Sequence, residues 1–229
     1  MGENVLVPVD GGTANAYLAR PASGSGPGVL VLPAWWGLGG HIRSVADRLA
    51  GEGFVALAPD VYRGSVATGV DEAQRLAAEL PAERAAGDLV GAARYLATAK
   101  GTSVSGRVGT VGFGLGGSLA LWAATLSADV VAAAAFYPLV PWRPSQPDWA
   151  AFAGTTAIVH AATEDAATTG PELQLAQKAV AEAGGELTVY DYPDTLRGFY
   201  NDDRLDAYDP RAGALAWART LELFRTTLT

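Results

Sequence analysis

The clearest chemical pattern in this sequence is Gly-Phe-Gly-Leu-Gly at residues 112–116. This glycine spacing, with a strand before it and a helix after it, is typical of a nucleophile elbow, whose central residue is normally an attacking serine or cysteine. Here the central residue is Gly114, which has no side chain and cannot attack a substrate. The N–H groups that begin the following helix, with Leu115 among them, still point toward a pocket. A plain glycine-rich turn is the simpler interpretation. A dinucleotide loop is a weak one, because the third glycine falls one place early.

Further candidates follow other apolar runs. Trp35 and Trp36 come after a strand-like run, and they are equally consistent with pocket lining and with core packing. His41 begins the next helix, where capping or packing is expected, but it could also reach the pocket mouth as an acid or base. His160 lies within an apolar run and is expected to be a core histidine.

The segment 136–149 is rich in proline and aromatic residues, and it includes Tyr137 and Trp142. It is expected to form a rim or lid over the site, although an inert surface loop has the same composition. Ser118 is a poor substitute nucleophile, because it lies one helical turn beyond Gly114. No group of residues has the spacing of metal ligands.

These residues must be positioned by the elements around them. Alternating runs at 5–10 and 14–20 predict an antiparallel hairpin, and the apolar runs predict buried strands. Helices are expected at 41–53, at 71–100 with a break near Pro81, at 115–126, at about 171–183 and at the chain's end. The buried strands are expected at 28–34, 54–60, 107–113, 130–138, 155–161 and 187–193. Strands that alternate with helices predict a mostly parallel sheet flanked by helices on both faces, which binds ligands at the carboxyl ends of its strands.

Composition limits the possible functions. The 229 residues suit one α/β domain, and the net charge of −8 argues against nucleic acid and anionic membranes as partners. The absence of cysteine excludes disulfides, thiolate metal sites and a thiol nucleophile. No apolar run reaches 18 residues and the first ten residues do not resemble a secretion signal. We therefore expect a cytoplasmic protein, monomeric or homodimeric, that acts on a small molecule.

Four blocks of the sequence together resemble the dienelactone hydrolase family. They are LPAWWGLGGHIRSVADRLAGEGFVALAPDVYRG, VGTVGFGLGGSLA, AAAAFYP and the segment from Tyr192 to Phe224, and the similarity extends over nearly the whole chain. The resemblance implies a single domain over residues 1–229 with an α/β-hydrolase fold. It also implies cleavage of small lactones or esters without a cofactor.

The same resemblance implies a catalytic triad of cysteine or serine, aspartate and histidine, and a glutamate that holds the resting thiol. The nucleophile position corresponds to Gly114, the histidine to Arg197 and the glutamate to Ala34, so only the acid remains, as Asp165. Arginine cannot act as a general base near neutral pH, because its pKa stays above about 12. Hydrolysis by this triad is therefore excluded.

The retained positions have two interpretations. Asp165 and Arg197 form a structural ion pair, or Arg197 is held by Asp165 and presents its charge to a carboxylate, enol or carbonyl oxygen. The resemblance also implies substrate contacts after the fourth strand, at Tyr62, and near Arg197, at Phe199, whereas Arg63 is expected at the surface.

Three functions follow, in order of preference. The first is an isomerase, lyase or cyclase that acts on a small, partly apolar, oxygenated molecule without a covalent intermediate. The second is a catalytically silent protein that binds such a molecule. The third is a hydrolase with unconventional machinery, such as water activated by Asp165 or His41.

Overall fold

The computed structural model describes residues 2–98, 106–140, 142–145, 147–163 and 170–229. Its centre is an eight-stranded sheet in the order β1-β2-β4-β3-β5-β6-β7-β8. The pairs β1–β2 and β2–β4 are antiparallel, and every other neighbouring pair is parallel. The strands are β1 (Glu3–Val9), β2 (Gly12–Ala19), β3 (Gly28–Leu32), β4 (Val55–Pro59), β5 (Val108–Phe113), β6 (Val130–Phe136), β7 (Thr156–Ala162) and β8 (Glu186–Tyr192).

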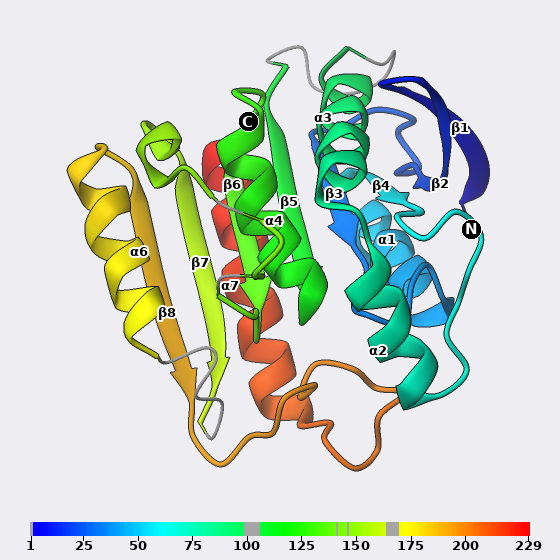
Figure 1. The fold of residues 1–229 in the computed structure, drawn as a ribbon. Helices are drawn as coiled ribbons and strands as arrows, with labels where there is room; N and C mark the ends of the chain where they lie inside the picture. The colour runs from blue at the N-terminus through cyan, green and yellow to red at the C-terminus, as the bar shows by residue number, and fades with distance from the viewer. Residues whose placement is uncertain (1, 99–105, 141, 146, 164–169) are drawn as a thin grey trace.

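Helices cover both faces of this sheet (Figure 1). The apolar side chains of α3, α4 and α6 pack on one face, and those of α1 and α7 pack on the other. The helices are α1 (Gly40–Gly51), α2 (Val70–Glu79), α3 (Ala82–Thr98), α4 (Leu115–Leu126), α6 (Pro171–Glu182) and α7 (Pro210–Thr227), with a short 3₁₀ helix at Trp149–Phe152. The predicted α/β architecture is confirmed, including the hairpin and the helix break at Pro81.

The burial of each element agrees with its sequence pattern. β3, β4 and β5 are buried along their whole length, as expected for continuous apolar runs between two helical layers. α1 buries only one stripe, which includes Ile42, Val45 and Leu49, whereas α4 is buried on nearly every side. No helix in the described part of the chain is long and apolar enough to cross a membrane.

The turn from β5 into α4 depends on close backbone contact. A Cβ atom at Gly112 would lie 2.0 Å from the carbonyl oxygen of Gly116, and one at Gly116 would lie 2.2 Å from that of Leu32. Neither position has space for a side chain. Gly114 has a φ of +56° and ψ of −115°, a conformation that residues with a side chain adopt only with strain. The outer glycines therefore bring strand and helix together, and the central one forms the apex.

We expect Gly116→Ala to destabilise the fold, because its methyl group would overlap the Leu32 and Pro33 carbonyl oxygens of β3 and the residue after it. The loss should be about 1–3 kcal/mol or more. The matched control is Gly51→Ala, a helical glycine with no atom within 4 Å of the added Cβ, which should gain about 0.5–1 kcal/mol. Urea unfolding of the three proteins measures both changes, and equal stabilities of the two variants would contradict the close-packing argument.

Candidate functional site

A cavity of about 760 Å³ opens beside the elbow, at the carboxyl ends of the parallel strands. Its wall comes from the segments after β3, β5, β6 and β8, together with α2 and the start of α1. The predicted residues that line it are Ala34, Trp35, Trp36, His41, Gly114, Leu115, Tyr137, Trp142 and Arg197. Segments far apart in the sequence thus meet where the parallel sheet was expected to bind a ligand.

The elbow forms one end of this cavity. The Gly114 N–H donates to the Phe136 carbonyl oxygen at 2.9 Å, which joins the apex to β6. Leu115 is the first residue of α4, so its N–H has no acceptor within the helix. The nearest atom to a Cβ built on Gly114 is Arg197 Nη1, at 4.0 Å. There is therefore space for a side chain at the apex, although the sequence places none there.

Arg197 lies across the apex. It comes from the segment between β8 and α7, and its Nη1 donates to the Tyr137 carbonyl oxygen at 2.6 Å. Its Nη2 lies 3.5 Å from the Pro138 carbonyl oxygen. These contacts to the segment after β6 hold the positive charge beside Gly114. Asp165, its predicted partner, lies outside the described residues, so the predicted pair stays a prediction.

Aromatic rings make much of the wall. The half-buried rings of Trp35 and Trp36 meet edge to face, with centroids 5.7 Å apart. Tyr137, another lining residue, is buried and has a φ of +38°, and its burial raises the pKa of its hydroxyl above the usual range. Trp142 packs against Trp122 of α4 at 5.8 Å. Such walls suit an apolar or aromatic ligand.

Two predicted contacts lie elsewhere. Tyr62 and Phe199 are not among the lining residues, because each packs into the core. Tyr62 is 6% exposed, and burial raises the pKa of its hydroxyl to about 12. Phe199 is fully buried between Tyr137 and Tyr192, at centroid distances of 5.5 and 4.9 Å. Phe199 therefore supports the wall from behind rather than forming it.

The other candidates have structural partners. His160 is buried, with Nδ1 2.8 Å from the Tyr192 hydroxyl and Nε2 3.0 Å from that of Thr220, and burial lowers its pKa to about 3. The expectation of a core histidine is confirmed. Ser118 bonds to both the N–H and the carbonyl oxygen of Leu139, so its hydroxyl fastens the rim to α4. Arg63 forms an ion pair with Asp88 at 2.6 Å.

Several lining residues were not predicted. Arg204 lies in the same Tyr192–Phe224 block as Arg197, and Arg143 lies in the rim segment, so proximity in the sequence could have indicated both. Ala77 lies on α2, and no sequence pattern distinguishes it from other alanines. The complete set of unpredicted lining residues is Ala77, Ala78, Phe113, Leu139, Arg143, Pro144, Gly198, Asn201 and Arg204.

Arginine is the only residue type with a permanent charge among the described lining residues, although the whole chain has a net charge of −8. Three arginines line the cavity, and none of its described lining residues is an aspartate or glutamate. Arg204 is ion-paired with Asp206, whereas Arg143 is exposed at the rim. No group of three or more potential metal ligands occurs among the described residues. The arrangement therefore suits a ligand with an apolar body and an anionic or carbonyl oxygen.

Comparison with known proteins agrees with this geometry. The family model described as "Dienelactone hydrolase family" matches residues 14–228. "Protein usf" of Aquifex pyrophilus is 31% identical over all of both chains. A "Probable 2-oxo-3-(5-oxofuran-2-ylidene)propanoate lactonase" of Bradyrhizobium sp. is also 31% identical, over 96% of this chain and 92% of its own. The crystal structure of the dienelactone hydrolase-like promiscuous phosphotriesterase P91, from metagenomic libraries, superimposes with a TM-score of 0.83 at 19% identity. That match covers 100% of this chain and 99% of the other, and it shows a shared fold.

We expect Gly114→Leu to block the cavity, because an added side chain would point toward Arg197. The probe is 8-anilinonaphthalene-1-sulfonate, an aromatic anion whose binding should quench the lining tryptophans. Its affinity should fall at least about 10-fold, which is 1.4 kcal/mol of binding free energy. Gly154→Leu is the matched control, since Gly154 also has a positive φ, +74°, and nothing within 4 Å, but lies outside the lining. Equal quenching of both folded variants would place the binding site elsewhere.

Proposed function

The chain belongs to the dienelactone hydrolase family, and on that premise we propose that its cavity supports chemistry other than hydrolysis through an acyl-enzyme. The proposed reaction is an isomerisation, elimination or ring closure of a small, partly apolar, oxygenated molecule. The observation that carries the proposal is the apex itself, where Gly114 offers no side chain and the Arg197 guanidinium lies 4.0 Å from the position a Cβ would take.

Acyl transfer needs a nucleophile and a base in hydrogen-bond contact. In our proposal Gly114 occupies the nucleophile position and Arg197 that of the histidine, and neither can perform its step. An arginine keeps its proton at neutral pH, so it cannot accept one from an attacking hydroxyl. Ser118 does not replace the nucleophile, because Leu139 engages its hydroxyl as both donor and acceptor.

The groups that remain are suited to stabilising negative charge. The Leu115 N–H and the Arg197 guanidinium lie at the same end of the cavity, and both are donors only. An enolate or phenolate oxygen that develops there would gain one charge-assisted contact, from Arg197, and one dipolar contact, from the Leu115 N–H. The aromatic walls would hold the apolar part of the molecule in one orientation.

The substrate class follows from the same features. The Bradyrhizobium relative is named for a lactone that carries a propanoate group, which is an unsaturated molecule with one carboxylate. The arginines of this cavity favour an anion of the same kind, and its volume admits a small molecule. We therefore propose an unsaturated lactone, enol acid or phenolic compound with one anionic group.

A second candidate is hydrolysis by unconventional machinery. The name of the lactonase relative favours it, because that protein is named for ring opening by water. In this alternative a water molecule activated by His41 or Asp165 attacks directly, without a covalent intermediate.

Product masses distinguish these candidates. We expect incubation with unsaturated lactones, phenolic esters and conjugated polyenes to give a new product that has gained no water. Its mass is unchanged after isomerisation or ring closure, which move atoms within one molecule, and it is lower by the mass of the leaving group after elimination. A product that gains one water would instead support the hydrolytic alternative. Saturable binding by every tested compound without turnover would mean that the protein only binds ligands.

Acyl-enzyme formation gives a second test. With 4-nitrophenyl acetate we expect no burst of nitrophenolate, although a slow steady rate is compatible with about 10³–10⁴-fold acceleration by the remaining donors alone. Gly114→Ser should also show no burst, because Arg197 cannot activate the hydroxyl, whereas Gly114→Ser/Arg197→His should acquire one. A stoichiometric burst from the unmodified protein, detected with the acylated mass, would overturn the proposal.

A further inference from the structure

His41 lines the cavity, and its ring nitrogens are unusual because they are buried without hydrogen-bond partners in the described part of the chain. It is the second residue of α1, its side chain is 12% exposed, and it forms part of the cavity wall. Among the described residues, neither of its ring nitrogens has a hydrogen-bond partner. Buried polar atoms without partners are rare, because each loses its contact with water without compensation. His41 therefore differs from His160, whose two nitrogens are both hydrogen-bonded.

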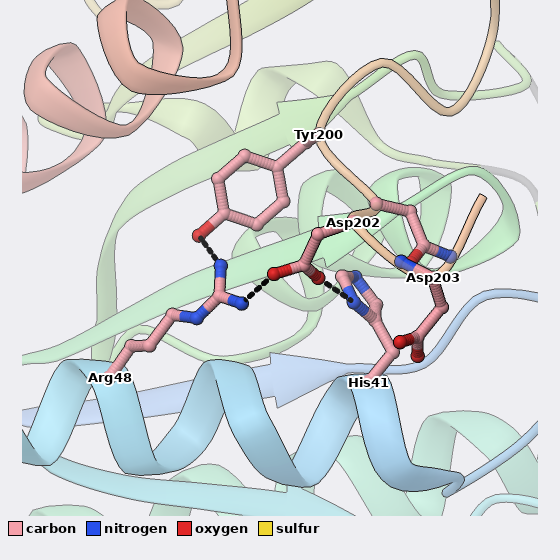
Figure 2. Close-up of polar contacts among 6 residues, drawn as sticks. His41, Arg48, Tyr200, Asp202 and Asp203 are labelled. Atoms are coloured by element: carbon pink, nitrogen blue, oxygen red, sulfur yellow. Dashed lines mark hydrogen bonds and ion pairs between the residues drawn. The ribbon is translucent and has the colours of Figure 1, made fainter. Parts of the chain in front are cut away.

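A carboxylate faces this ring. Asp202 Oδ1 lies 3.6 Å from His41 Nδ1, and the Asp202 side chain is itself ion-paired with Arg48 (Figure 2). Arg48 also donates to the Tyr200 hydroxyl at 3.5 Å. The chain of contacts thus runs from α1 to the segment between β8 and α7 and back to α1. It turns Nδ1 toward Asp202, whereas Nε2 is buried without a hydrogen-bond partner among the described residues.

The ring is also held by aromatic neighbours. Phe113 and Tyr200 meet it edge to face, at centroid distances of 5.5 and 6.1 Å. Phe113 is the last residue of β5 and directly precedes Gly114, so the histidine lies next to the strand that leads into the apex.

The charges around His41 favour a base rather than a permanent cation. Burial lowers the pKa of His41 from its usual 6.5, and the charge of Arg48 acts in the same direction. The negative charges of Asp202 and Asp203 oppose this change in part. Burial alone would raise the pKa of Asp202, but its contacts with Arg48 hold that pKa below the usual value. At neutral pH the pair is a neutral imidazole beside a carboxylate, the form in which a histidine accepts a proton.

We propose that His41 is the proton-transferring group of this cavity and that Asp202 is its positioning residue. The proposal rests on the proposed function and specifies how that chemistry proceeds without a nucleophile. Asp202 selects the tautomer with the proton on Nδ1 and stabilises the imidazolium that forms. In this pair the histidine comes from α1 and the carboxylate from the segment between β8 and α7, which also carries Arg197.

The step balances within one substrate molecule. In our proposal the His41 ring turns so that Nε2, which is buried in this structure, reaches the ligand. Nε2 then takes a proton from a carbon next to the ligand's carbonyl group, and the C–H electron pair forms the enolate. The enolate oxygen is stabilised by Arg197 and the Leu115 N–H. The imidazolium then returns the proton to another carbon of the conjugated system, so the product is an isomer and His41 is neutral again.

The role of His41 as a base can be tested with a model substrate whose reaction requires only the removal of a proton. 5-Nitrobenzisoxazole is a small, planar aromatic molecule suited to these walls. Removal of its C3 proton forms a nitrile, breaks the N–O bond and releases a coloured phenolate. We expect the protein to accelerate this reaction, and His41→Gln to lose about 10²-fold or more of the rate. Asp202→Asn should lose roughly 10-fold or more, because a misoriented imidazole is a poorer base.

Asp203→Asn is the matched control, since it removes a neighbouring charge that acts on His41 without the close contact. Its limiting rate at high pH should stay within about 2-fold of the unmodified protein, because general-base efficiency changes only gradually with a small change in pKa. Equal losses in the Asp202 and Asp203 variants would overturn the positioning role. Circular dichroism and urea unfolding show which variants are folded.

A second measurement follows the titration of His41 in the unmodified protein. The chain has two histidines, and the ring signal in its proton NMR spectrum that is missing from the His41→Gln spectrum belongs to His41. Its pKa should coincide with the inflection of the rate against pH. A different inflection, a His41→Gln protein of full activity, or no acceleration beyond that of free imidazole would overturn the proposal. The product masses with lactones test the proposed function separately.

Discussion

The site depends first on the close contact between the backbone at the start of α4 and the backbone at the end of β3. At the start of α4, Gly116 lies so close to the end of β3 that a single added carbon would overlap the Leu32 carbonyl oxygen. This contact brings the helix N-terminus to the edge of the sheet and sets the apex at Gly114 beside the cavity. Because the constraint falls on the outer glycines, the geometry of the elbow does not require a reactive residue at its centre. The shape of the elbow therefore depends on the outer glycines and not on a side chain at its apex.

The second constraint is electrostatic. The chain carries a net charge of −8, yet the cavity is lined by arginines, with no lining carboxylate among the described residues. Arg197 is fixed by the carbonyl oxygens of Tyr137 and Pro138, which lie on the segment directly after β6. Low-dielectric aromatic walls strengthen the attraction of such a charge for an anion. The same wall thus combines apolar rings with the positive charge of Arg197.

The segment between β8 and α7 joins these features to α1. It provides Arg197, Gly198, Asn201 and Arg204 to the cavity, and it also provides Asp202, whose contacts with Arg48 and His41 fasten it to α1. The position of Arg197 and the orientation of the buried His41 ring are therefore linked through the segment between β8 and α7. We expect the loss of the Asp202 contact with Arg48 or with His41 to change both the position of Arg197 and the orientation of the His41 ring.

The sequence by itself determined the elements, the hairpin, the break at Pro81, the elbow and the lack of a side chain at its apex. These features follow from local backbone preference, apolar periodicity and residue identity, which need no knowledge of distant contacts. Only the tertiary structure decided that β4 lies between β2 and β3, and that Tyr62 and Phe199 pack in the core rather than on the wall. It also brought Ala77, Arg143 and Arg204 to the cavity and Asp202 to His41. These contacts depend on how the helices and loops pack against the sheet. Because the residues in each contact are far apart in the sequence, no local sequence pattern predicts them.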